Sequence, residues 1–201
     1  MNIKYILLFF FLAVPAFVKA AEVPMSLAGI RLGDDISTAH HCCKLSTDIP
    51  LAEERHLNEI HLQSQFVAGI KAGAVAYANC GQKGRIVRIK LKFDDPSRAF
   101  FDDLLRRYEK EFGKPKEWRG DPFQSIISWK WSFKDAGKQV NLELTHSKDE
   151  DYKMGNFVKL SLRSLYEEEV LCLKRSQENS GTGASSPTPR DMLDYRQLIP
   201  R

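Results

Sequence analysis

The sequence predicts an α+β fold, in which a mainly antiparallel sheet has helices on one face. Two patterns support this fold. One segment carries apolar residues at helical spacing, and several others alternate apolar with polar residues, as half-buried strands do. Because each predicted strand is apolar on one side only, we expect one sheet face on the core and the other in water.

The clearest predicted helix covers residues 96–112, with Asp95 as its cap and Pro96 in its first turn. Gly113 is a typical end for such a helix. Its apolar face comprises Phe100, Phe101, Leu104, Leu105, Tyr108 and Phe112. A shorter helix is expected near residues 36–44. The acidic run at residues 167–169 is typical of a solvated helix start.

Residues 87–93 are the clearest predicted strand, because apolar residues alternate there with Arg88, Lys90 and Lys92. Further strands are expected near residues 59, 72, 125, 139 and 156. The segment near residue 72 is rich in alanine, which is depleted in strands, so its pattern is less distinct.

Two of these strands share a pattern, which suggests an internal repeat. Residues 84–92 and 155–163 both read glycine, two spacers, valine, a base, isoleucine or leucine, a spacer, leucine and a base. Each segment ends a run of one predicted helix and three predicted strands. We therefore predict tandem α-β-β-β units at residues 29–94 and 95–166. A chance likeness between two amphipathic strands is the alternative.

The first twenty residues are typical of a cleavable signal peptide, with Lys4, an apolar run over residues 5–18 and small residues before Ala21. Pro15 interrupts a run that is shorter than the roughly 20 apolar residues of a membrane span. We therefore expect signal cleavage, no transmembrane anchor, and a mature protein that is periplasmic or secreted.

The mature chain divides into a folded domain over residues 21–173 and a tail over residues 174–201. The tail is rich in Ser, Gly, Thr and Pro, which predicts disorder. Its end carries Met192, Leu193, Tyr195, Leu198 and Ile199 and is interpreted as either a frayed terminus or a docking peptide. Of the +4 net charge, the signal and the tail each hold +2, so the domain is neutral. This balance argues against nucleic acid as the partner.

The four cysteines, Cys42, Cys43, Cys80 and Cys172, are an even set, which in an exported chain suggests disulfides. A bond between the neighbours Cys42 and Cys43 would form a strained ring. We therefore expect one of these two to bond Cys80 and the other to reach Cys172.

No catalytic motif stands out, since a nucleophile elbow, a phosphate loop and a dinucleotide fingerprint are all missing from the sequence. The contiguous run His40–Cys43 suits structural cysteines better than a zinc site, whose ligands are spaced apart. His56 and His61 do not match the zinc-protease spacing. The sequence therefore predicts no enzyme, cofactor or metal. The alternatives are a small metal-dependent hydrolase built on these histidines, or a structural envelope protein.

A basic sheet face is the candidate binding surface. Arg88, Lys90 and Lys92 lie on the outer side of one strand, and Lys159 and Arg163 on that of its predicted copy. If the two strands are neighbours, these five side chains form one patch. The alternative is ordinary solubility, with Glu143 and other acids compensating.

The segment Leu32-Gly33-Asp34 and the order of a helix followed by strands resemble two groups of small exported bacterial proteins. These are the small lipoproteins of outer-membrane protein assembly and the secreted β-lactamase-inhibitory proteins. A lipid-anchor cysteine is missing here, which departs from the first group. The resemblance implies a protein-binding module. We therefore expect a non-enzymatic interaction module whose partner is another envelope or secreted protein.

Overall fold

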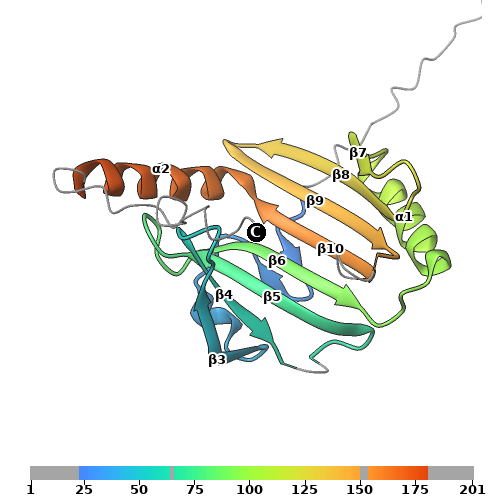
Figure 1. The fold of residues 1–201 in the computed structure, drawn as a ribbon, viewed down its shortest axis with the longest axis horizontal. Helices are drawn as coiled ribbons and strands as arrows, with labels where there is room; N and C mark the ends of the chain where they lie inside the picture. The colour runs from blue at the N-terminus through green and yellow to red at the C-terminus, as the bar shows by residue number, and fades with distance from the viewer. Residues whose placement is uncertain (1–22, 64–65, 150–153, 181–201) are drawn as a thin grey trace, which may run out of the picture.

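The computed structural model describes residues 23–63, 66–149 and 154–180, so the predicted signal peptide and residues 181–201 of the predicted tail lie outside the described residues. One eight-stranded antiparallel sheet dominates the fold (Figure 1), with the strand order β3-β4-β5-β6-β10-β9-β8-β7. This sheet and its two helices confirm the predicted α+β class.

The elements follow one another as two similar series. A small hairpin comes first, formed by β1 (Ser26–Leu27) and β2 (Ile30–Arg31). The first series is η1 (Ile36–Ala39), β3 (Cys43–Pro50), β4 (Leu57–Leu62), β5 (Ile70–Ala78) and β6 (Ile86–Phe93). The second series is α1 (Arg98–Phe112), β7 (Glu117–Gly120), β8 (Ile126–Asp135), β9 (Lys138–Ser147) and β10 (Gly155–Leu162). Helix α2 (Arg163–Ser180) follows without a break.

The first predicted helix is only the single turn η1. Asp35 caps this turn, and its carboxylate accepts a hydrogen bond from the Ser37 backbone N–H at 3.0 Å. The chain then enters β3 at Cys43, which pairs with Leu62 of β4. Each series therefore has four strands instead of the predicted three, because β3 and the short edge strand β7 were missing from the prediction.

The two series meet at the centre of the sheet, where β6 pairs with β10. Ile89 lies directly opposite Leu160, and these two residues are also equivalent in the predicted repeat. An internal two-fold axis would pass between such a pair. The strand order agrees with this symmetry, whereas common descent of the two units stays a prediction.

The core lies on one side of the sheet, where the apolar residues of the alternating strands collect. Phe101 of α1 is buried here, and Tyr108 packs edge-on against Trp131 with ring centroids 5.8 Å apart. The Trp131 indole N–H donates to the backbone oxygen of Gly113 at 2.7 Å, which satisfies a polar atom in the core. Helix α1 therefore covers the half of the sheet formed by β8 and β9 (Figure 1).

Helix α2 packs at the end of the sheet and extends beyond it, as the left side of Figure 1 shows. It continues to Ser180, so the predicted disordered tail, which began at Lys174, was wrong for residues 174–180. The prediction that the acidic run at residues 167–169 is solvated was also wrong in part, because the Glu169 side chain is fully buried. Among the described residues, no helix is long and apolar enough to cross a membrane.

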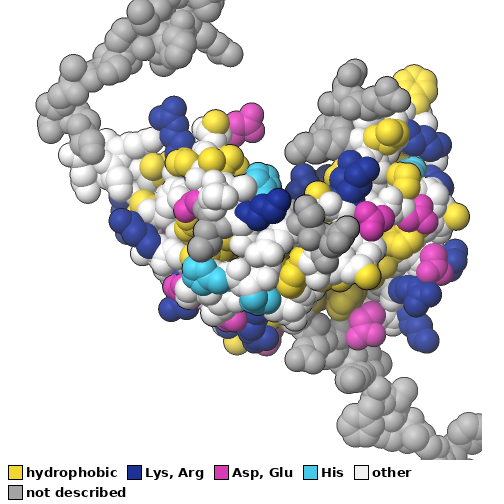
Figure 2. Space-filling model, turned by 90° about the horizontal axis from the view of Figure 1, so that it is seen from below, with side chains coloured by type: hydrophobic (Ala, Val, Ile, Leu, Met, Phe, Trp, Pro, Cys, Tyr) yellow, Lys and Arg dark blue, Asp and Glu magenta, His cyan; other side chains and the backbone are white. Residues whose placement is uncertain are grey.

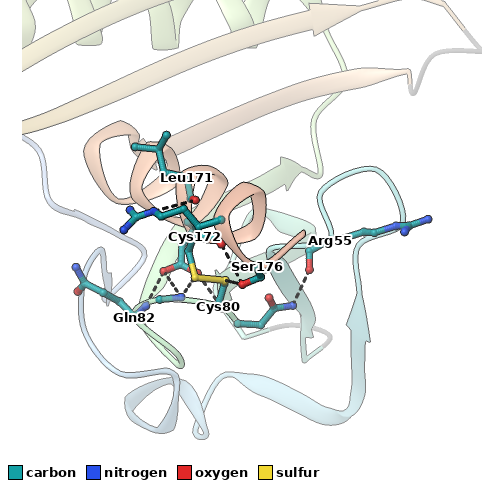
Figure 3. The surroundings of a disulfide bond; sticks show 10 residues. Arg55, Cys80, Gln82, Leu171, Cys172 and Ser176 are labelled. Atoms are coloured by element: carbon teal, nitrogen blue, oxygen red, sulfur yellow. Dashed lines mark hydrogen bonds between the residues drawn. A yellow bond between two sulfur atoms is a disulfide. The ribbon is translucent and has the colours of Figure 1, made fainter. Parts of the chain in front are cut away.

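A disulfide joins α2 to the turn between β5 and β6 (Figure 3). It links Cys80 to Cys172, so the expected pairing of Cys80 with Cys42 or Cys43 was wrong. The reason is the path of the chain, since Cys43 begins the edge strand β3 and Cys80 lies beside α2. Next to the disulfide, the Glu169 carboxylate accepts hydrogen bonds from the backbone N–H groups of Cys80, Gly81 and Gln82 at 2.6–3.1 Å.

Candidate functional site

The outer face of β6 and β10 brings the predicted basic residues together. Because the two strands are neighbours, Lys90 lies directly opposite Lys159, and Lys92 lies opposite Phe157. Arg88 lies opposite Ser161 in the same pairing. We call the surface formed by Arg88, Lys90, Lys92, Lys159 and Arg163 the basic face. Its existence as one patch follows from the strand order, whereas its use in binding stays a prediction.

Arg163 joins this patch from a different element than expected. It is the first residue of α2 and no longer part of β10. Its guanidinium pairs with Glu167 one helical turn later at 2.8 Å and lies 5.1 Å from the centre of the Tyr166 ring. The start of α2 thus forms one border of the basic face.

Acidic side chains neutralise part of the basic face. Arg88 contacts Glu54 at 2.7 Å and Glu59 at 3.8 Å. Burial alone would raise the pKa of Glu54, but the hydrogen bonds and the charge of Arg88, together with contributions from Tyr166 and His56, hold this pKa below its ordinary value. Lys159 contacts Glu143 at 2.8 Å. The alternative interpretation, in which nearby acids compensate the basic side chains, is therefore correct for Arg88 and Lys159.

Lys90 and Lys92 both lie over an aromatic ring, that of Phe157. Their ammonium nitrogens lie 5.6 and 5.3 Å from the ring centre. Phe157 is only 9% exposed although it stands on the polar side of the sheet. The two ammonium groups lie over the ring, which is the arrangement of a cation–π contact.

A hollow of about 460 Å³ lies beside the two lysines, over strand β5. Ala72 and Ala74 lie opposite Lys92 and Lys90, and their small side chains leave room between β4 and β6. We call this hollow the β5 trough. Its lining is Leu51, Glu59, His61, Ala72, Gly73, Ala74, Arg88, Lys90, Lys92, Phe157 and Lys159. The alanine-rich strand that made the sequence pattern indistinct is thus the floor of the hollow.

A second hollow of about 520 Å³ adjoins the trough and shares Arg88 and Lys159 with it. It extends over β8, β9 and the start of α2, where Tyr166 lines it. Figure 2 views the molecule from the side of β3 to β5 and shows basic, acidic and histidine side chains interspersed there, with the surface hollowed toward the top of the view. Phe157 and Tyr166 were not predicted as lining residues, since neither stands out from the apolar pattern around it.

The four candidate histidines do not come together. His40 and His41 are exposed beside η1, and His61 lines the β5 trough. His56 is buried against the Tyr166 ring, with the ring centroids 5.0 Å apart. Within residues 23–63, 66–149 and 154–180, no group of three or more His, Cys, Asp or Glu residues is arranged to hold a metal ion.

The two remaining cysteines form a buried pair of thiols. The sulfur atoms of Cys42 and Cys43 lie 3.3 Å apart, and the Cys42 thiol also contacts the backbone oxygen of Ala39 at 3.1 Å. Burial, together with the neighbouring Cys42, raises the pKa of Cys43 to about 12. Such thiols are weak nucleophiles, because the reactive species is the thiolate. The pair therefore serves as part of the apolar packing under β3.

Buried His56 predicts a dependence of stability on pH. Burial lowers its pKa below the ordinary 6.5, although Glu54 and Glu169 act in the opposite direction. The unfolded chain then binds the proton more readily than the folded one, so the free energy of unfolding should fall as the pH drops below about 6.5. Urea unfolding followed by tryptophan fluorescence at pH 7.5 and 5.5 measures the difference. His56→Phe should reduce it and the exposed-site control His61→Gln should not; an undiminished fall in His56→Phe would refute the assignment.

The sheet with its open polar side defines this chain as an open-faced α+β protein. No known protein family matches the chain, and neither does any curated protein. Among solved structures, a DUF4309 family protein from Bacillus subtilis aligns over 57% of this chain and 69% of its own length, with 14% identity and a TM-score of 0.32. So loose a similarity supports no inference about function.

Proposed function

We propose that this protein is a non-enzymatic interaction module of the periplasm or of the secreted fraction, and that it binds another envelope or secreted protein through the basic face. The observation that carries the proposal is the pairing of Lys90 with Lys159 at the centre of the sheet. This register places cationic side chains of two neighbouring central strands together on the open side of the sheet. Such clustering of one charge complements an oppositely charged surface of a protein partner.

Export is supported by two independent features. The first twenty residues are typical of a signal peptide. The Cys80–Cys172 disulfide is of the kind that forms in oxidising compartments. The resemblance to small exported protein-binding proteins agrees with both features, and a partner in the same compartment follows from them.

Substitution of both Lys90 and Lys92 by Ser tests this function. The full chain is expressed, purified from the exported fraction, cross-linked in envelope extract and analysed by mass spectrometry for bound proteins. We expect at least a tenfold loss of the captured partner, since two charges at the centre of the contact are removed. Arg88 is left intact because it pairs with Glu54, and its loss would disturb the fold as well as the surface.

The matched control is Lys110→Ser with Lys114→Ser. These residues are exposed at the end of α1, on the other side of the sheet, so the variant loses the same charge away from the basic face. Capture by this control should equal that of the unmodified chain. Equal capture by both double variants would refute the basic face as the contact surface, and metal analysis of the purified protein would then test the hydrolase alternative.

A further inference from the structure

The paired thiols of Cys42 and Cys43 have no part in the proposed function. Adjacent residues of a strand point to opposite faces, but here a turn over residues 40–42 leads into β3, and both thiols lie in the core. Their sulfur atoms are 3.3 Å apart, whereas the two sulfurs of a disulfide are about 2.05 Å apart. Closing a bond between them therefore requires an approach of about 1.3 Å.

The pair lies at an edge of the sheet that opens more readily than its centre. β3 is an edge strand, and its register with β4 shifts between Lys44 and Ile49. Gln63 holds the pair from the β4 side, since its backbone N–H donates to the Cys42 oxygen at 2.8 Å and its side-chain amide to the Cys43 oxygen at 3.4 Å. Local opening of such an edge requires less free energy than global unfolding. It also removes the burial that raises the pKa of Cys43, so that the reactive thiolate becomes available.

We propose that Cys42 and Cys43 are a site of reversible oxidation, at which a small-molecule disulfide converts the two thiols into a disulfide between neighbours. One cysteine sulfur attacks the oxidant R–S–S–R, whose S–S bond breaks, and the leaving R–S⁻ takes up the proton of the attacking thiol. The second cysteine sulfur then attacks the cysteine sulfur of this mixed disulfide and expels the other R–S⁻, which takes up the second proton. Two cysteine thiols are thereby oxidised, and one R–S–S–R is reduced to two R–SH. The site is separate from the basic face, so this inference does not depend on the proposed function.

The new bond differs from Cys80–Cys172 in its strain and in its effect on the fold. A disulfide between adjacent residues closes a small strained ring, and strained disulfides are reduced more readily than relaxed ones. The Cys80–Cys172 bond instead links residues 92 positions apart and constrains a long loop. Oxidation also withdraws the Cys42 thiol from the Ala39 oxygen, which it contacts at 3.1 Å, and so loosens η1 at its connection with β3. The pair is therefore a labile redox couple beside a permanent disulfide.

Treatment of the purified exported protein with oxidised glutathione, followed by an acid quench and mass spectrometry of the peptide that contains both cysteines, provides the test. We expect this peptide to lose two hydrogen atoms and to carry no glutathione, while Cys80 stays joined to Cys172. On titration with dithiothreitol, the new bond should open at a reductant concentration at least about tenfold lower than Cys80–Cys172. Unchanged thiols, a lasting glutathione adduct, or a peptide that joins Cys42 or Cys43 to another cysteine would each overturn the inference.

Two single variants separate access to the thiols from closure of the bond. In Cys43→Ala we expect Cys42 to keep a glutathione adduct, because the thiol that would displace it is missing. Cys42→Ala should trap an adduct on Cys43 for the same reason. Urea unfolding checks that each variant is folded, and the loss of two hydrogen atoms in the unmodified chain is a readout that needs neither of them. Folded variants that both stay free of adducts would overturn the two-step route through a mixed disulfide.

Discussion

Replacing Cys172 with Ser is expected to lower the free energy of unfolding by about 4 kcal/mol, the largest single effect we predict outside the apolar core. The disulfide connects residues 92 positions apart, so its loss releases a long loop in the unfolded chain. It also frees α2 from the β5–β6 turn, which the bond holds at a Cα separation of 6.0 Å (Figure 3). Urea unfolding of the exported protein measures the change, and the melting temperature should drop by about 10 °C.

Two controls make this result specific. Cys80→Ser should produce the same loss, and the double variant should lose no more than either single one, because both changes remove one bond. Mild reduction of the unmodified protein should reproduce the effect. Peptide mapping without reduction should recover Cys80 joined to Cys172, with Cys42 and Cys43 as thiols. A peptide that joins Cys80 to Cys42 or Cys43 would contradict the structure.

The cysteines illustrate what the sequence can and cannot predict. Their even number indicated a disulfide, but the choice of partners depends on which turns meet in space. The Cys80–Cys172 bond requires β10 to lead directly into α2 beside the β5–β6 turn. This arrangement arises from the pairing of β6 with β10, which links distant parts of the chain. Local periodicity contains no information on such pairings, so the predicted partners were wrong.

Strand prediction succeeded where alternation was strong and failed where it was weak. The apolar and basic alternation of β6 predicted both its existence and its outward side. Strand β7 has four residues, too few to show a period. Strand β3 begins at Cys43, after a turn over residues 40–42 that follows η1, and the apolar residues of this region fit a helix equally well.

The candidate site was predictable in its charges and unpredictable in its shape. Arg88, Lys90 and Lys92 were assigned to the open side of the sheet because they alternate with apolar residues. The trough beside them depends on Ala72 and Ala74 lying next to that row, which only the register of β5 on β6 determines. The partners that neutralise Arg88 are Glu54 in the β3–β4 connection and Glu59 in β4, and neither pairing follows from the local sequence pattern.

Replacing Glu169 with Gln is expected to cost about 2–3 kcal/mol of unfolding free energy. Glu169 is fully buried, and its two oxygens accept four hydrogen bonds from the N–H groups of Cys80, Gly81 and Gln82. A glutamine keeps the shape but replaces one acceptor oxygen with an NH₂ group, which faces backbone donors and cannot accept from them. Backbone N–H groups of the turn would then be left without an acceptor.

Glu168→Gln is the matched control for this prediction, because Glu168 is exposed and contacts Gln82 through a single side-chain bond at 2.6 Å. It should change the free energy of unfolding by no more than about 0.5 kcal/mol. Glu169 and Cys172 hold the same turn, so the two substitutions should not be additive. With the disulfide absent, the turn can move to find water, and Glu169→Gln should then cost less. An equal cost in both backgrounds, measured by urea unfolding, would show that the carboxylate and the disulfide stabilise α2 independently.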